Sequence, residues 1–449
     1  MQYDSRIARR RFLKASAAAA TGIVAGATLG GAAKGEAASS KVSWLVRTGP
    51  TENAWEQKVA IPHFQKKHPE VSVQPLIVPG PQFDVKLANL VSAGTPPDVW
   101  SQWGPSNFVD YSYRGLTADI TPFLKTDIKE YADFYPGALD YGKWNHRQTG
   151  IPLMLGGTYT FYNMDLFDKA GVPYPTANWD DKSWNWNAMI AVAKKLTKYY
   201  GDPNKAIYGA IFLLGCLEEH VWLWGGDVWD KDVYTEKGVP RTSHWNTPEA
   251  MGAIQALADL TYAHKVSPSP AVVSALAGTS DPFLTGRVAM EMTGIWGFWT
   301  FKDAPFRWGA AALPGMQSNK NGIYADPWLV SSRSKDPNAA WQFVKYLTTT
   351  QGAREYMKAT NTPVPHTGLL QEWLKQFKTM KPEQLKMLFD GSLKHGYLSI
   401  QNDLVAYDRI RDIINQEFDP VLKGTAKAKD IAPGVDNKLH SRVLRRLKP

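Results

Sequence analysis

Three stretches near the start of the chain, residues 41–47 (KVSWLVR), 71–78 (VSVQPLIV) and 98–100 (DVW), indicate the fold. In the first, Val42, Trp44 and Val46 fall on one face, the alternation that is typical of a β-strand. The two intervening segments instead carry apolar residues at helical spacing, as at Phe83 and Leu87. Strands that alternate with helices predict an α/β fold with a parallel sheet and crossover helices.

The length and composition indicate two globular lobes with an unusual aromatic content. A chain of 449 residues exceeds what one hydrophobic core normally serves. Its 44% apolar and 21% charged residues are ordinary globular values, which exclude disordered and fibrous classes. Eighteen Trp and nineteen Tyr are more than such cores normally use. We therefore expect part of the aromatic set to face a ligand.

Charge and cysteine content exclude several classes of partner and cofactor. The chain has 51 basic and 42 acidic residues. Residues 1–40 contain six of the basic and two of the acidic residues, so the rest of the chain has a net charge of only +5. The basic run at 442–448 is typical of a solvated helix end, and we expect no nucleic-acid partner. Cys216 is the only cysteine, so no intrachain disulfide and no cysteine metal cluster can form, and we expect it to be a small buried apolar residue.

The N-terminal segment has the layout of an export signal. Arg9-Arg10-Arg11-Phe12-Leu13-Lys14 precedes an Ala- and Gly-rich stretch and the small residues near Ala37. It resembles the twin-arginine motif, with Ala8 in place of the usual Ser or Thr. A membrane anchor is the alternative, but four glycines make a poor bilayer-spanning helix. We predict a signal peptide over residues 1–38, no lipoprotein anchor because no cysteine stands near the cleavage region, and a soluble periplasmic or extracellular protein.

Patterns further along the chain add helices and Trp-rich loops. Residues 188–199 and 248–264 have helical periodicity, whereas residues 178–186 and 227–245 are loop-like and rich in Trp. Asp336-Pro337 predicts a helix start, with Asp336 as N-cap and Pro337 at the first helical position. The mature chain contains no repeat and no low-complexity linker, so we expect the lobes to be joined by strand crossovers.

Three motifs in order resemble the extracellular solute-binding proteins of ABC importers, of the maltose-binding type. The first runs from Val42 to Phe123 and includes Thr95-Pro96-Pro97-Asp98-Val99. The second is Tyr162-Asn163-Met164-Asp165-Leu166-Phe167. The third is Phe283 to Met290 followed by Gly294-Ile295-Trp296, Ala312-Leu313-Pro314-Gly315 and the helix at Asp336. The resemblance covers nearly all of residues 41–449. It implies two α/β lobes joined by three crossovers, which close like a hinge on a ligand. We assign residues 41–152 and 315–362 to the N-terminal lobe, and residues 153–314 and 363–449 to the C-terminal lobe.

Aromatic side chains are the first candidates for ligand contact, because sugars present flat C–H patches that stack on aromatic rings. Trp103 follows the third predicted strand, at the end where parallel sheets bind their ligands. Tyr162 and Trp296 fall on positions similar to the family's cleft, and Trp328 follows a predicted crossover. Each could instead be a core residue. Tyr159 would lie on the opposite strand face from Tyr162, so only one of the two can face the cleft, and we expect it to be Tyr162.

Polar candidates lie in two segments. Glu52 and Asn53 open the first helix beside Thr51, where N-capping is the alternative role and the expected one for Thr51. The segment from Glu218 to Trp224 places two carboxylates beside His220, but no second histidine stands at ligand spacing, so we predict no metal site. We expect this segment to supply Trp224 to the wall of the second lobe.

The predicted function is a transport receptor that captures a mono- or oligosaccharide and delivers it to the permease subunits of an ABC importer. We expect a monomer that needs no cofactor. The alternatives are a secreted carbohydrate-active enzyme, or a receptor for a phosphorylated polyol, a polyamine or a metal chelate. An enzyme is disfavoured because the candidate carboxylates form no convincing catalytic pair; they are Glu52, Asp98, Glu218, Glu219, Glu291 and Asp326.

Overall fold

The computed structural model describes residues 40–102, 107–234, 238–278, 281–399 and 403–447. The predicted signal peptide therefore lies outside the described residues. Residues Ala38–Pro449 form one compact unit. No helix in the described ranges combines the length and the apolar character that a membrane span requires.

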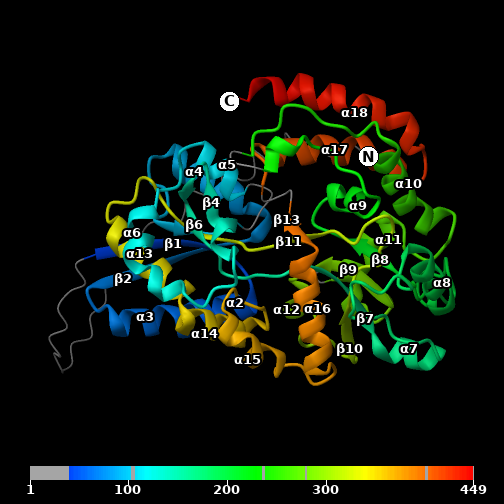
Figure 1. Cartoon of the computed structure of the whole chain (residues 1–449), viewed down its shortest axis with the longest axis horizontal. Helices are drawn as coiled ribbons and strands as arrows, with labels where there is room; N and C mark the ends of the chain where they lie inside the picture. Colours follow the sequence, from blue (N-terminus) through cyan, green and yellow to red (C-terminus); the bar gives the residue numbers. More distant parts are fainter. Residues whose placement is uncertain (1–39, 103–106, 235–237, 279–280, 400–402, 448–449) are drawn as a thin grey trace, which may run out of the picture. The chain divides into compact units, whose positions relative to one another are not determined.

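The first lobe is built on a five-stranded sheet in the order β2-β1-β3-β12-β6 (Figure 1). Its strands are β1 (Ser40–Arg47), β2 (Val71–Val78), β3 (Val99–Trp100), β6 (Gly150–Ile151) and β12 (Trp328–Val330). β2 and β3 pair with β1 in parallel, as the sequence predicts, whereas β12 is antiparallel to both β3 and β6. The helices around this sheet are α2 (Pro50–Trp55), α3 (Ile61–Lys67), α4 (Phe83–Ser92), α5 (Phe108–Tyr113), α6 (Thr121–Asp127), α13 (Pro337–Thr348) and α14 (Thr350–Thr360).

Alternation along β1 explains how this sheet is covered on both faces. Val42, Trp44 and Val46 share one hydrophobic core with residues of α3 and α13, as their common face predicts. Leu45 points the other way, into a second core that contains residues of α4 and α5. Asp336 caps α13 as predicted, because its Oδ1 accepts a hydrogen bond from the Ala339 amide at 3.0 Å.

The second lobe is built on a four-stranded sheet in the order β10-β7-β9-β8. Its strands are β7 (Thr158–Asn163), β8 (Ile211–Leu213), β9 (Met290–Gly294) and β10 (Trp308–Ala311). β9 runs parallel to β8 and antiparallel to β7. The helices of this part of the chain are α7 (Met164–Ala170), α8 (Trp186–Leu196), α9 (Leu217–Leu223), α10 (Pro248–Tyr262), α11 (Pro270–Ala277), α12 (Gly297–Thr300) and α16 (Pro382–Lys394).

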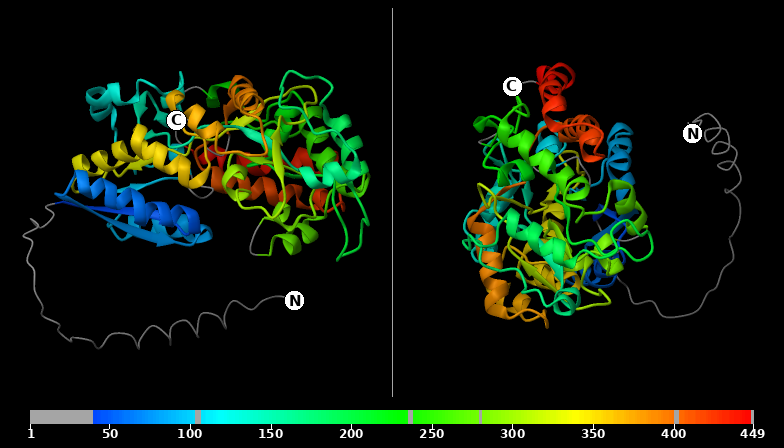
Figure 2. Two further views of the ribbon diagram at one scale, coloured as in Figure 1. Left: turned by 90° about the horizontal axis from the view of Figure 1, so that it is seen from below. Right: turned by 90° about the vertical axis from the view of Figure 1, so that its right-hand side faces the viewer.

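The C-terminal helices α17 (Tyr407–Leu422) and α18 (Ala428–Arg442) pack against each other and against α10 (Figures 1 and 2). The segment that leads into α17 also contacts the first lobe. Asn107 Nδ2 donates to the Leu404 carbonyl at 2.9 Å, and the Ala406 amide donates to Asp110 Oδ1 at 2.9 Å. Residues 404–406 are therefore bonded to α5, although the sequence assigned them to the C-terminal lobe.

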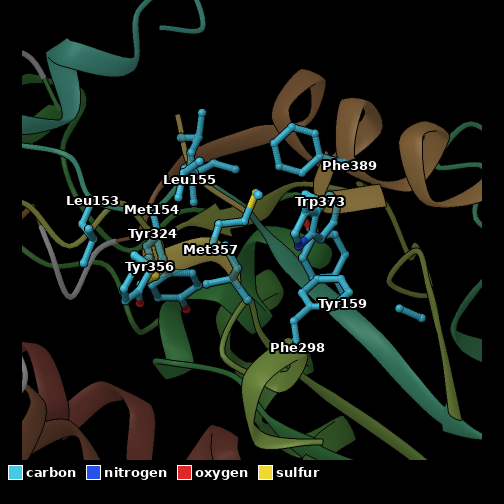
Figure 3. Close-up of a cluster of buried hydrophobic side chains, with 14 of the residues drawn as sticks. Leu153, Met154, Leu155, Tyr159, Phe298, Tyr324, Tyr356, Met357, Trp373 and Phe389 are labelled. Atoms are coloured by element: carbon cyan, nitrogen blue, oxygen red, sulfur yellow. The ribbon is translucent and has the colours of Figure 1, made fainter. Parts of the chain in front are cut away.

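Three segments of chain cross between the lobes and are hydrogen-bonded to one another. The Leu153 amide donates to the Ala325 carbonyl at 3.1 Å, and the Leu155 amide donates to the Pro363 carbonyl at 3.2 Å. Figure 3 shows the apolar side chains of this region, where Leu153 and Leu155 lie near Tyr324 and Met357. Beside the crossovers, β11 (Asn321–Ile323) pairs with β13 (Gly396–Leu398), and α15 (Leu370–Leu374) follows the third crossover.

Two further segments bond across the predicted lobe boundaries. Residues 315–323 remain with the second lobe, because Gly315 forms a bridge with Asn185 and Asn319 Nδ2 donates to the Trp179 carbonyl at 2.7 Å. The second crossover therefore lies at residues 324–327 and not at residue 315. Residues 365–367 also bond to the first lobe, since the Thr367 amide donates to the Asp133 carbonyl.

Candidate functional site

The carboxyl ends of the first lobe's parallel strands bring charged side chains to one edge of the sheet. Arg47 is the last residue of β1, and Glu52 lies in the first turn of α2. The Arg47 Nη2 donates to Glu52 Oε1 at 2.8 Å and its Nε donates to Oε2 at 3.3 Å. This two-point contact holds the guanidinium plane in a defined orientation.

Asn53 forms hydrogen bonds within the turn that connects β1 to α2. Its Oδ1 accepts from the Gly49 amide at 3.0 Å, and its Nδ2 donates to the Arg47 carbonyl at 2.8 Å and to Glu56 Oε2 at 2.6 Å. Because both ends of its amide are engaged in these local contacts, Asn53 stabilises the turn that carries Arg47 and Glu52. Burial raises the pKa of Glu56 to about 8, so this carboxyl is largely protonated at neutral pH.

Asp326 lies in the second crossover with a left-handed backbone, at φ +37°. Gln102 Nε2 donates to its Oδ1 at 3.2 Å, and Ser101 Oγ donates to the carbonyls of Asp326 and Pro327 at 3.2 and 3.0 Å. Burial raises the pKa of Asp326 to about 7. At neutral pH this carboxyl can therefore either donate or accept a hydrogen bond.

An aromatic ring of the second lobe meets this polar edge. Trp299 lies in α12, just beyond the carboxyl end of β9, and the Arg47 Cζ lies 5.9 Å from its ring centroid. That distance permits a cation–π contact between the lobes. We call Arg47, Glu52, Gln102, Asp326 and Trp299 the junction cluster. It combines a flat apolar face with donors and acceptors, which suits a ligand that carries both C–H patches and hydroxyl groups.

A pocket of about 350 Å³ lies where the β4–β5 hairpin of the first lobe, formed by β4 (Lys143–Trp144) and β5 (Arg147–Gln148), approaches the chain around β13. It is lined by Trp144 and His146 of the hairpin and by Tyr234, Leu398 and Asp403 from the other side. Burial raises the pKa of Asp403 to about 7. The pocket therefore repeats the combination of an aromatic ring with groups that form hydrogen bonds.

Tyr162 and Trp296, which the sequence places in one cleft, do not lie together. Thr158 pairs with Gly294, whereas Tyr162 pairs with Met290, so Tyr162 lies roughly 13 Å along the strand pair from the end that leads to Trp296. The Tyr162 ring is 7% exposed and packs against Phe167 and Tyr174. The prediction that Tyr162 faces the same cleft as Trp296 is therefore not supported by this geometry. Tyr159 is fully buried as well.

Two further predicted residues, Trp328 and Trp224, pack against other Trp rings in this structure. Trp328 is 1% exposed, and its ring centroid lies 5.3 Å from that of Trp44, so it has no free face on which a sugar could stack. Trp224 follows α9, is partly exposed and packs edge-on against Trp186 at 4.7 Å, with Gly252 of α10 against its indole, so its predicted contact with ligand stays a prediction. A Trp-rich sequence pattern alone does not distinguish such packing from ligand contact.

Two predictions about aromatic residues remain open. Trp296 is partly exposed at the end of the second sheet, and its ring packs edge-on against Tyr324 with centroids 4.9 Å apart. Trp103 lies outside the described residues. The sequence reasoning did not select Arg47, Gln102 or Trp299. The available signals were the position of Arg47 at a strand end, that of Gln102 beside Trp103, and the one-turn spacing from Trp296 to Trp299.

The carboxylates of the segment from Glu218 to Trp224 are buried and structural. Glu219 Oε1 accepts hydrogen bonds from Tyr324 Oη at 2.7 Å and from Ser399 Oγ at 2.6 Å, and its Oε2 accepts from Thr158 Oγ1 at 3.4 Å. Among the described residues no group of three or more metal-ligating side chains is present. Glu219 thus ties the start of β7 and the second crossover to the residue that follows β13.

Comparisons with known proteins agree on one family and one fold. A family model described as bacterial extracellular solute-binding protein matches residues 48–354. The multiple sugar-binding protein of Streptococcus mutans is 24% identical over 347 residues, 71% of this chain and 77% of that protein. The galactooligosaccharide-binding protein of Bacillus subtilis is 24% identical over 330 residues, 72% of each chain. A substrate-binding protein of an ABC transporter from Listeria monocytogenes, solved with cycloalternan, superposes with a TM-score of 0.76 at 24% identity over 90% of this chain and 98% of that one.

Proposed function

The chain belongs to the family of bacterial extracellular solute-binding proteins, and from that premise we propose that it captures a carbohydrate between its two lobes for an ABC importer. Membership confirms the family resemblance predicted from the sequence, and the superposition confirms the two-lobed α/β fold. The names of the two curated relatives and the cycloalternan complex support a mono- or oligosaccharide as the ligand.

The junction cluster is the observation that carries this proposal. The Arg47–Glu52 pair and Asp326 belong to the first lobe and to the second crossover, whereas Trp299 belongs to the second lobe. A sugar placed at this edge would stack on the indole and exchange hydrogen bonds with the carboxyl and guanidinium groups. Because neither lobe alone supplies both kinds of contact, we propose that binding accompanies hinge closure.

The finer parts of the proposal follow from the same premise. The closed, loaded protein would present its sugar to the membrane permease and return it chemically intact, as a monomer and without a cofactor. Export through the twin-arginine signal over residues 1–38, without a lipid anchor, remains part of the proposal, because that segment lies outside the described residues. Trp296 and Trp103 remain proposed ligand contacts.

A thermal-shift screen against neutral oligosaccharides, a phosphorylated polyol and a polyamine tests the proposal. A sugar present at about a hundred times its dissociation constant should add about 2.7 kcal/mol to the stability of the folded protein. Trp299→Ala should weaken sugar binding by about 2 kcal/mol or more, as expected for the loss of an aromatic anchor. Tyr174→Ala is the matched control, since Tyr174 is exposed and packs against Tyr162 at the far end of the second sheet.

Three outcomes would contradict the proposal. Thermal stabilisation by the phosphorylated polyol or the polyamine, and by no sugar, would show that the ligand is not a carbohydrate. Equal sugar affinity in the wild type and in Trp299→Ala would remove the junction cluster from the site. Release of shorter sugars during incubation would favour an enzyme.

A further inference from the structure

A second cavity, of about 500 Å³, lies within the second lobe. It opens beside β8, the edge strand of the sheet, and is bounded by α9, α10, α11 and α17. Its walls are mainly apolar and include Phe212, Leu213, Leu257, Val273 and Leu422. Its volume falls in the range of small-molecule sites, roughly 300 to 1,000 Å³. None of the residues of the junction cluster lines it.

Arg411 of α17 is the cationic side chain in this lining, and no Asp or Glu lines the cavity with it. Within the described parts of the chain, Arg411 makes no ion pair, and its Nε is buried without a hydrogen-bond acceptor. A buried guanidinium N–H without an acceptor is unfavourable, because the group has lost water and gained nothing in exchange. The Nε itself has no exposed surface, so a ligand in the cavity would meet Arg411 at its terminal Nη atoms, which no acidic side chain of the lining neutralises.

His220 of α9 adds a second polar group without a partner. Its side chain is 3% exposed, and its Nδ1 has no hydrogen-bond partner among the described residues. Burial lowers the pKa of His220 to about 3, so the ring is neutral at physiological pH. The neutral ring adds no charge, which leaves Arg411 as the group that attracts an anion.

Helix α11 covers one side of the cavity loosely. Its sequence is apolar except for Ser274, yet none of its described side chains is fully buried. Pro270, Val273 and Ser274 of this helix line the cavity. A chain of methylene groups inside would give these side chains the apolar contact that they lack.

We propose that this cavity binds a small amphipathic monocarboxylate, such as an unbranched fatty acid of medium length. Its carboxylate pairs with Arg411, whose guanidinium matches two carboxylate oxygens in geometry and charge. Its alkyl chain lies among Phe212, Leu257 and Val273. The site is separate from the sugar site and does not depend on the proposed function.

Isothermal titration of the folded protein with hexanoate, octanoate and decanoate tests the inference. Affinity should rise about fourfold for each added methylene, which corresponds to about 0.8 kcal/mol, until the cavity is filled. Octanol should bind at least about tenfold more weakly than octanoate, because hydrogen bonds to charged groups are the stronger ones.

Variants separate the roles of charge and volume. Arg411→Met should weaken octanoate binding about tenfold or more and abolish the preference for octanoate over octanol. Arg409→Met, an exposed arginine on the same helix, should change neither. Leu257→Trp fills the cavity and should block all three acids, which keeps the test valid if Arg411→Met folds poorly.

Because the two sites are separate, the thermal shift caused by sugar should be the same in all of these variants. For the same reason, a failure of the protein to bind sugar would not contradict the proposed carboxylate site. Three results would overturn it. They are the absence of octanoate binding at millimolar concentration, equal binding of octanoate and octanol, and wild-type affinity in Arg411→Met.

Discussion

Asp326 shows at the scale of one residue how strain and burial coincide at the junction cluster. Its φ of +37° is a conformation that side chains with a Cβ rarely adopt, and such strain is of the order of 1 to 3 kcal/mol. Burial also disfavours its charged form. The Ser101 hydroxyl holds this backbone in place by donating to the carbonyls of Asp326 and Pro327. Strain that the surrounding structure enforces is concentrated at functional positions in proteins.

Asp326→Gly should therefore separate stability from binding. Glycine adopts a positive φ without strain, so we expect the free energy of unfolding to stay the same or to rise by up to about 1 kcal/mol. Sugar affinity should fall about tenfold, because the carboxyl is lost from the junction cluster. Urea unfolding and titration of the same preparation measure the two effects.

The pH dependence of this variant has a defined sign. The folded protein keeps the proton of Asp326 up to about pH 7, whereas the unfolded chain releases it near its ordinary pKa of 3.8. The contribution of this group to stability therefore falls as the pH rises from about 4 to about 7. The stability of Asp326→Gly relative to the wild type should accordingly be greatest at pH 7. Asn361→Gly, which also relieves a positive φ, is the control and should leave sugar affinity unchanged.

At the scale of elements, α13 shows how a short signal specifies a helix. Asp336 caps the helix through the Ala339 amide and also accepts a hydrogen bond from Ser40 Oγ at 2.6 Å. Pro337 occupies the first helical position, where its missing N–H has no intrahelical partner to lose. The cap therefore joins the start of α13 to the start of β1.

Asp336→Ala should lower the free energy of unfolding by about 1 kcal/mol, the usual effect of losing an N-cap. The hydrogen bond from Ser40 lowers the pKa of Asp336, so its contribution is present above the ordinary pKa of 3.8 and is lost as the pH falls below it. The difference in urea midpoint between the wild type and Asp336→Ala should thus be larger at pH 7 than at pH 3. Asp336→Asn retains the cap and should cost less, and a change in sugar affinity would contradict a purely structural role.

At the scale of the whole molecule, the crossovers behave as one unit. The Tyr324 amide donates to the Gly156 carbonyl at 2.9 Å, which joins the second crossover to the first. Glu219 binds Thr158 at the start of β7, Tyr324 of the second crossover and Ser399 after β13 through a single carboxyl. A hinge that is tied in this way can transmit a movement of one lobe to the other.

Glu219→Ala should lower the free energy of unfolding by more than about 3 kcal/mol, because Tyr324 and Ser399 would each keep a buried hydroxyl without its partner. Glu219→Gln keeps an acceptor and should lose less than half as much. Glu218→Gln is the matched control, since Glu218 is equally buried and bonds Tyr407 of α17. Equal losses in Glu218→Gln and Glu219→Gln, measured by urea unfolding, would show that Glu219 has no special place in the hinge.

The local features of this protein follow from its sequence. Strands β1 and β2, the helices that follow them and the cap of α13 depend on alternation, helical spacing and turn residues that are close in the chain. Cys216 is buried as expected from its apolar neighbours. The family and the two-lobed fold were predictable too, because the order of several short motifs carries that information.

The sequence identified Glu52 as a candidate for the site, but the rest of its composition was decided by the tertiary structure. Trp328 and Trp299 both lie near crossovers or strand ends in the sequence, yet one is buried against Trp44 and the other meets Arg47. Which ring fills a core and which faces a partner depends on strand register and on contacts between residues that are hundreds of positions apart. The same holds for Tyr162, whose place at the far end of β7 is set by its pairing with Met290. Periodicity identifies the face of a strand on which a residue lies, whereas only the packing of the two lobes determines what that face meets.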